Sequence, residues 1–286
     1  MLTYLKLLIL SLFGGLFAAL PVSYSAHISY LNAVTSFTED RDQLGFYFAI
    51  VSAVFALVVL FKLRRIYSKA FRVTLTPAKK IEDPNLKKTC RGTVLGLLIS
   101  LLPAALMFVP LSEGRFVMDV LISLLQKDYL LVTASCCIGS GIFLFLAMWY
   151  TSKHYDRPHR TARPLSVLRF SVYQLPSHLL PGISHTATGA TALLLTDVED
   201  LVIEREVLLY LAPSMLIVNV ARIVRFILGG LALQPVLIAI AAVGGLLGSI
   251  LTLHLISKFN IRKNYLFFAI YSILFGALIV VTSFLI

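Results

Sequence analysis

Hydrophobic residues gather along the chain in stretches of about 20 residues, the length that a helix needs to cross a hydrocarbon layer of about 30 Å. Six of these stretches are continuous, and short polar segments separate them. They cover residues 44–61, 93–109, 129–150, 207–228, 236–256 and 265–286. The pattern predicts an all-α, polytopic integral membrane protein with about six transmembrane helices.

Two further apolar stretches, residues 2–32 and 165–195, are interrupted by residues that break helices. Pro21 lies in the first, and Pro176, Pro181 and Gly182 lie in the second. Irregular backbone at membrane depth persists only where it is buried in protein or lines a wet cavity, because lipid cannot satisfy its amides and carbonyls. We therefore expect each stretch to enter the membrane and return on the same side, as a re-entrant helical hairpin.

Basic residues predict the orientation of these segments. Between positions 62 and 91, ten basic residues stand against two acidic ones, so this loop should be cytoplasmic. If residues 165–195 re-enter, the later cluster of Lys258, Arg262 and Lys263 is also cytoplasmic, and both termini lie outside. The two hairpins then approach from opposite faces, as in an inverted-topology repeat.

We expect a single membrane domain over residues 1–286, with repeat one at about 1–150 and repeat two at about 165–286. The first apolar stretch is expected to stay in the protein, because Pro21 follows the small residues where a signal peptide would be cleaved. The break of each hairpin carries a leucine-proline pair followed by hydroxyl groups and a histidine. These segments are Leu20 to His27 and Leu180 to Ala187.

Composition agrees with a membrane protein that is surrounded by lipid. Hydrophobic residues make up 58% of the chain and charged residues only 14%, and the net charge is +11. The basic residues fall in loops between spans, where the positive-inside bias accounts for them, so no nucleic-acid partner is implied. Cys90, Cys136 and Cys137 show no metal-binding spacing.

Polar residues at the two breaks are the candidates for a binding site. Helices that start after Pro21 and Pro181 would direct free N–H groups toward an anion. Further donors are Ser23, Ser25, Ser184, Thr186 and Thr188, which as readily cap helix starts. His27 and His185 are either satisfied buried histidines or functional ones, since ionisable groups inside a membrane are functional candidates.

Two other residues also have two interpretations. Tyr24 fits packing or substrate contact, and Arg222 either extends to the interface or contacts a diphosphate.

At these motifs the sequence resembles the undecaprenyl pyrophosphate phosphatase family of the BacA type, membrane enzymes that release phosphate from the lipid carrier of bacterial cell-wall synthesis. Leu20 to His27 looks like the family's leucine-proline-[VI]-serine-serine-[ST]-glycine-histidine segment, and Pro181 to His185 looks like its proline-glycine-x-serine-arginine segment. Two later segments, Leu208 to Pro213 and Phe268 to Tyr271, are also similar to family segments.

The resemblance implies His27 and Ser184 as catalytic residues. It implies substrate contacts from Ser23, Tyr24, Ser25, His185, Thr186 and Thr188. Arg222 is added as a substrate contact because of its position near the end of a span. The family uses a divalent cation, but the positions aligned with its metal ligands are Gly14 and Ala18, and its phosphate-clamping arginine is His185. We therefore expect no metal site from these positions, and the cofactor stays open.

The resemblance further implies a multi-pass protein of the bacterial cytoplasmic membrane that acts on a polyprenyl (pyro)phosphate during recycling of cell-wall precursors. Losing the metal ligands and the arginine removes most of the charge neutralisation on which phosphoryl transfer depends. Whether hydrolysis survives is left open by these departures. The alternative is a non-hydrolytic protein that binds or translocates a polyprenyl phosphate.

Overall fold

The computed structural model describes residues 2–38, 40–77, 80–111, 116–117, 129–154, 161–196, 198–199, 202–232, 234–258 and 264–285. This part of the chain folds into helices and contains no strand, as the sequence predicts. The helices are α1 (Leu2–Ala18), α2 (Tyr24–Thr35), α3 (Arg41–Leu75), α4 (Pro84–Ser100), α5 (Leu102–Met107), α7 (Tyr129–His154), α8 (Pro164–Leu179), α9 (His185–Leu194), α10 (Ile203–Leu228), α11 (Pro235–Lys258) and α12 (Tyr265–Ser283).

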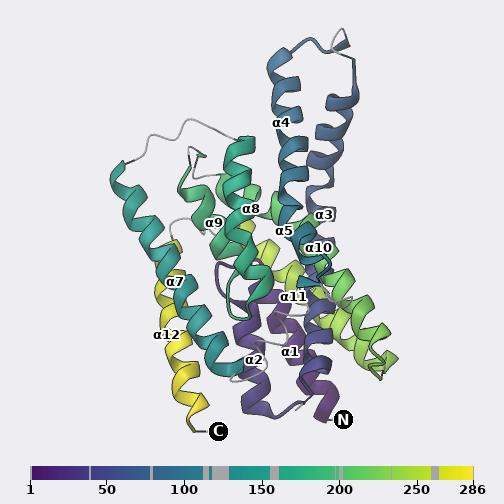
Figure 1. Cartoon of the computed structure of the whole chain (residues 1–286), viewed down its shortest axis with the longest axis vertical. Helices are drawn as coiled ribbons and strands as arrows, with labels where there is room; N and C mark the ends of the chain where they lie inside the picture. The colour runs from purple at the N-terminus through teal and green to yellow at the C-terminus, as the bar shows by residue number, and fades with distance from the viewer. Residues whose placement is uncertain are drawn as a thin grey trace.

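Six segments of the described chain are long and apolar enough to cross a membrane, and they coincide with the six predicted spans. They are α3, the α4–α5 pair, α7, α10, α11 and α12. α3 continues well past its apolar part, and together with α4 it projects beyond the other helices (Figure 1). This projection carries the basic segment that predicts the cytoplasmic side. Arg262 and Lys263, which also entered the prediction of orientation, lie outside the described residues.

The two interrupted stretches form helical hairpins, α1–α2 and α8–α9, that approach the centre of the molecule from opposite ends (Figure 1). Both chain termini lie at the same end of the molecule, which agrees with an even number of crossings. Re-entry of the hairpins into a membrane is compatible with this arrangement and stays a prediction, as does the division into repeats at about 1–150 and 165–286.

The tip of each hairpin is the connection between its two helices together with the first turn of the second helix; the connections are residues 19–23 and 180–184. Two hydrogen bonds join the tips. The backbone N–H of Gly182 donates to Ser25 Oγ at 3.0 Å, and the Thr186 hydroxyl donates to the carbonyl oxygen of Leu20. Ser25 and Thr186 each lie two residues after a serine that caps its helix. Each tip thus satisfies backbone groups that the other tip leaves without a partner.

Glycines allow the hairpins to pack closely against the spans. Gly182 has a φ of +88°, and a Cβ on it would overlap the backbone of Thr133 in α7, so both its conformation and its position require glycine. In α11, a Cβ on Gly248 would overlap the carbonyl oxygen of Leu12 in α1. These contacts between backbones hold α1, and with it the first tip, in place.

We expect Gly248→Ala to lower the stability of the protein, because the added methyl group forces α1 away from α11, at a cost of about 1–3 kcal/mol. Thermal unfolding in detergent, followed by the fluorescence of Trp149, measures the effect. Gly139→Ala in α7 is the matched control, since a Cβ there meets no atom within 4 Å. Equal melting temperatures for the two variants would contradict this account of the packing.

Candidate functional site

A cavity of about 470 Å³ lies beside the joined tips. The end of α2 and the start of α3, which contribute to its lining, lie at the end of the molecule that holds the termini (Figure 1). Its walls come from α2, the first turns of α3 and α7, the end of α8 with the tip that follows it, and the last part of α10. The lining residues that bear polar groups are Tyr24, Ser25, Ser29, Asn32, Thr38, Arg41, Asp42, Tyr129, Ser177, His178, His185 and Arg222. The volume is typical of a small-molecule site.

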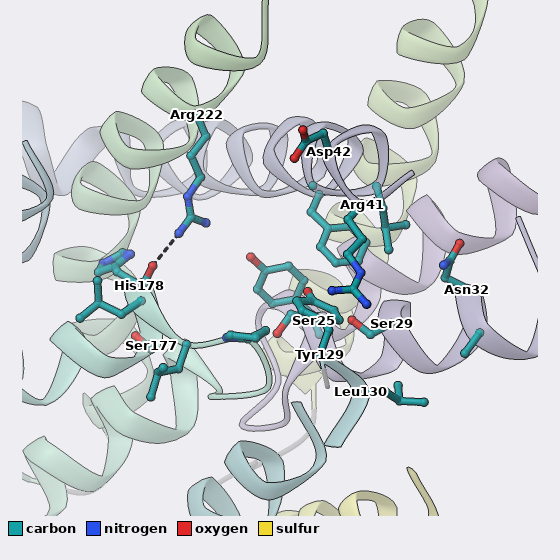
Figure 2. A pocket seen from close by; sticks show the side chains of 18 of the residues that line it. Ser25, Ser29, Asn32, Arg41, Asp42, Tyr129, Leu130, Ser177, His178 and Arg222 are labelled. Carbon is teal, nitrogen blue, oxygen red and sulfur yellow. Dashed lines mark hydrogen bonds between the residues drawn. The ribbon is translucent and has the colours of Figure 1, made fainter. Parts of the chain in front are cut away.

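Arg222 brings a positive charge into the inner part of this cavity. Its Nη2 donates to the carbonyl oxygen of His178 at 2.5 Å, and Figure 2 shows the side chain extending from α10 toward that carbonyl. Its Nε is buried and has no hydrogen-bond partner among the described residues. No carboxylate of the described chain lies within ion-pair distance of the guanidinium. The charge is therefore available to an anion in the cavity.

Two histidines stand beside this arginine. The rings of His178 and His185 lie 4.8 Å apart, and both side chains are buried. The Nδ1 of His185 and the Ser177 hydroxyl are 2.7 Å apart, and the backbone carbonyl of His185 accepts from Gln174 Nε2 at 2.6 Å. The Nε2 of His178 is buried and has no partner in the described structure. A polar ligand could satisfy it, which would offset the cost of about 1–3 kcal/mol for an unpaired buried group.

A second arginine lies at the mouth of the cavity. Arg41 belongs to the first turn of α3, and its guanidinium lies 5.8 Å from the centre of the Tyr129 ring. In Figure 2, Arg222 and Arg41 stand on two sides of the cavity, with Ser25 and Tyr129 between them and Ser29 beside Arg41. The Tyr129 hydroxyl is within electrostatic range of both arginines.

Four of the nine residues that the sequence predicts for the site line the cavity: Tyr24, Ser25, His185 and Arg222. The Tyr24 hydroxyl is hydrogen-bonded to Ser52 Oγ at 2.7 Å, and Ser25 is bonded to the opposite tip. Tyr24 and Ser25 therefore line the cavity and at the same time make hydrogen bonds that hold the fold together.

The other hydroxyl groups hold the helix starts together. Ser23 accepts from the backbone of Ala26, and Ser184 accepts from the backbone of Ala187, each at 3.1 Å. Thr188 donates to the carbonyl oxygen of Ser184 at 2.8 Å, and Thr186 lines a separate pocket of only about 20 Å³ on the far side of the tips. Their predicted contacts with a ligand, and catalysis by Ser184, stay predictions.

The His27 side chain has hydrogen bonds at both ring nitrogens and aromatic contacts on both faces of the ring. Its Nδ1 donates to the carbonyl oxygen of Ser23 at 2.6 Å, and in the neutral ring Nε2 accepts from the Tyr271 hydroxyl at 2.7 Å. The ring is stacked between Phe17 and Phe275, with both centroids 4.0 Å away. His27 is not among the residues that line the large cavity. Its predicted catalytic role stays a prediction, and any such role requires the bond to Tyr271 to open.

The positions aligned with the metal ligands do not fit a cation. A Cβ on Gly14 would meet the side chains of Ile28 and Val51, and Ala18 is buried among apolar neighbours. The described residues contain no group of three or more histidine, cysteine, aspartate or glutamate side chains that could hold a metal ion. The positive charge near the tips comes instead from arginine.

Arg41, Tyr129 and His178 were not among the residues predicted for the site. His178 is two residues before the second leucine-proline pair, so its position beside the break was a usable signal. Arg41 begins α3 and Tyr129 begins α7, two segments far apart in the chain, and the fold brings these two helix starts together.

Comparison with known proteins agrees with the resemblance found in the motifs. The family model described as "Bacitracin resistance protein BacA" matches residues 7–278. The undecaprenyl-diphosphatase of Neisseria gonorrhoeae (strain ATCC 700825 / FA 1090) is 25% identical over 289 residues, which cover 97% of this chain and 94% of that protein. The chain belongs to the BacA family of bacitracin resistance proteins.

Proposed function

We propose that the protein acts on undecaprenyl diphosphate in the bacterial cytoplasmic membrane and places the diphosphate in the cavity beside Arg222. The observation that carries this proposal is the guanidinium of Arg222, which faces the cavity without a carboxylate partner in the described chain. A half-buried cation inside a membrane protein is expensive unless an anion compensates it. The relative from Neisseria gonorrhoeae is an undecaprenyl-diphosphatase, which supplies the substrate class.

The surroundings of the cavity fit a lipid with a diphosphate head group. Polar groups gather at the tips and along α2, whereas the outer faces of α7, α11 and α12 expose large apolar side chains, including Phe143, Leu247 and Phe267. A polyprenyl tail can therefore remain in lipid while its head group enters the cavity. Arg222 would orient the diphosphate, and His178 would offer a hydrogen-bond donor or acceptor to it.

A specific observation favours binding or translocation without hydrolysis as the second candidate function. Asp42, at the mouth, is the only carboxylate among the described residues that line the cavity. The tips separate this cavity of about 470 Å³ from a pocket of about 20 Å³ at Pro21 and Thr186, so the space beside the tips is unequal on the two sides. That arrangement is one that a transporter built on an inverted repeat can use.

We expect Arg222→Gln to weaken binding of undecaprenyl diphosphate by about 2–5 kcal/mol, because it removes the charge that faces the buried head group. Binding is measured with the purified protein in detergent, and phosphate release is followed in parallel with and without Mg²⁺ or Ca²⁺. The matched control is Arg225→Gln, which changes an exposed arginine one turn further along α10.

The measurements of binding and of phosphate release distinguish the two candidate functions. Release of phosphate that Arg222→Gln abolishes supports hydrolysis, whereas binding without release supports the non-hydrolytic candidate. Unchanged binding in the Arg222 variant would contradict the placement of the head group in this cavity.

For His27→Ala we expect a loss of stability of about 2–4 kcal/mol, because the change empties the space between two aromatic rings and leaves Tyr271 without its partner. We expect the protein that remains folded at low temperature to bind undecaprenyl diphosphate as the unchanged protein does. Melting temperature and binding are measured on the same preparation. Normal stability together with lost phosphate release would instead support the catalytic role that the family motif implies.

A further inference from the structure

The cavity contains two positive groups at different depths, and only one of them has a place in the proposed function. Arg222 approaches from α10 at the inner end, and Arg41 approaches from the first turn of α3 at the mouth. The hydroxyl of Tyr129 is in electrostatic range of both. Two cations on either side of one polar group provide separate positions for two linked anionic groups.

The charge of Arg41 has no carboxylate partner among the described residues. No carboxylate of this part of the chain is within ion-pair distance of its guanidinium, although Asp42 also lines the mouth. The neighbouring Asp40 is engaged in capping α3, since its Oδ1 accepts from the backbone of Asp42 and of Gln43. The start of α3 adds a partial positive charge of its own in the same place.

The contact with Tyr129 gives Arg41 a defined position despite its exposure. A guanidinium over an aromatic face is held by cation–π attraction and keeps its N–H groups free at its edges. Those groups match the oxygens of a phosphate, which arginine binds through two parallel hydrogen bonds. An exposed arginine without such a support would be mobile and would contribute little selectivity.

From this geometry we infer that Arg41 and Arg222 form a two-point site that selects a diphosphate over a monophosphate. Arg222 holds the phosphate at the inner end of the cavity, and Arg41 holds the second phosphate at the mouth. The inference rests on the proposed function and adds a specificity-determining residue, Arg41, to it. A monophosphate can occupy only one of the two positions, so it loses one of the two contacts.

The test compares undecaprenyl diphosphate with undecaprenyl monophosphate, both binding to the purified protein in detergent. The unchanged protein should bind the diphosphate more tightly, by about tenfold or more, since a hydrogen bond to a charged group contributes roughly 1.5–3 kcal/mol. Arg41→Gln should weaken binding of the diphosphate to the level of the monophosphate and leave binding of the monophosphate unchanged. Arg222→Gln should weaken binding of both lipids.

Further measurements distinguish the loss of a charge from the loss of folding, and recognition of the lipid from recognition of a free phosphate. Arg41→Lys keeps the charge and should restore part of the selectivity, and melting temperatures identify a variant that has failed to fold. Arg64→Gln changes an exposed arginine on the distant part of α3 and should have no effect. Inorganic diphosphate should compete with the lipid more strongly than inorganic phosphate in the unchanged protein, and equally in the Arg41→Gln variant.

The results distinguish failure of the two-point site from failure of the proposed function. If Arg41→Gln weakens binding of both lipids by the same factor, or of neither, the two-point site is wrong while the lipid site at Arg222 stands. If the unchanged protein binds neither lipid, the proposed function itself fails. Equal affinity of the unchanged protein for the two lipids overturns the two-point site as well.

Discussion

The pair of hydrogen bonds between the hairpin tips is the interaction on which the rest of this structure depends. Each tip interrupts a helix inside the bundle, where a buried amide or carbonyl without a hydrogen-bond partner is costly. The bonds from Gly182 to Ser25 and from Thr186 to Leu20 answer this requirement from both sides. Because the tips must meet to form them, α2 and α9 start at fixed places, and the cavity forms beside their first turns.

The cost of this arrangement explains why so many hydroxyl groups gather at the tips. Ser23 and Ser184 cap the two helix starts, and Ser140 accepts from the backbone of Ser184. Serine and threonine are small enough to fit between helices and can both donate and accept. A segment rich in such residues is therefore needed for folding alone, before any ligand is considered, and its presence says little about which hydroxyl touches a substrate.

Because the same hydroxyl groups can serve folding or substrate contact, the sequence alone could predict the fold better than the role of each polar residue. The six spans followed from hydropathy, because length and apolarity decide membrane crossing almost by themselves, and the two breaks followed from proline and glycine. The roles of single polar residues did not follow. His27 and Ser23 lie four residues apart in the same motif, and both are engaged in internal hydrogen bonds. Arg41 and Tyr129 belong to no motif and reach the cavity through the packing of distant segments.

The positions of charge show how this chain differs from the pattern that the family motifs imply. Gly14 and Ala18 stand in tight apolar packing, so the space near the first break is filled by neighbouring side chains. Positive charge enters instead on arginine side chains from α10 and α3. A guanidinium keeps its charge at any pH a cell experiences and needs no supply of ions, whereas a bound cation depends on its concentration.

The unequal volumes on the two sides of the joined tips have a topological consequence. The cavity on the side of the termini has a volume of about 470 Å³, and the pocket on the other side of the tips has a volume of about 20 Å³. A group that binds beside the tips therefore finds room on the side of the termini and almost none on the other side. On the proposed function, this conformation accepts a head group from the end of the molecule that holds the termini, so it distinguishes chemically identical lipids by the side from which they approach.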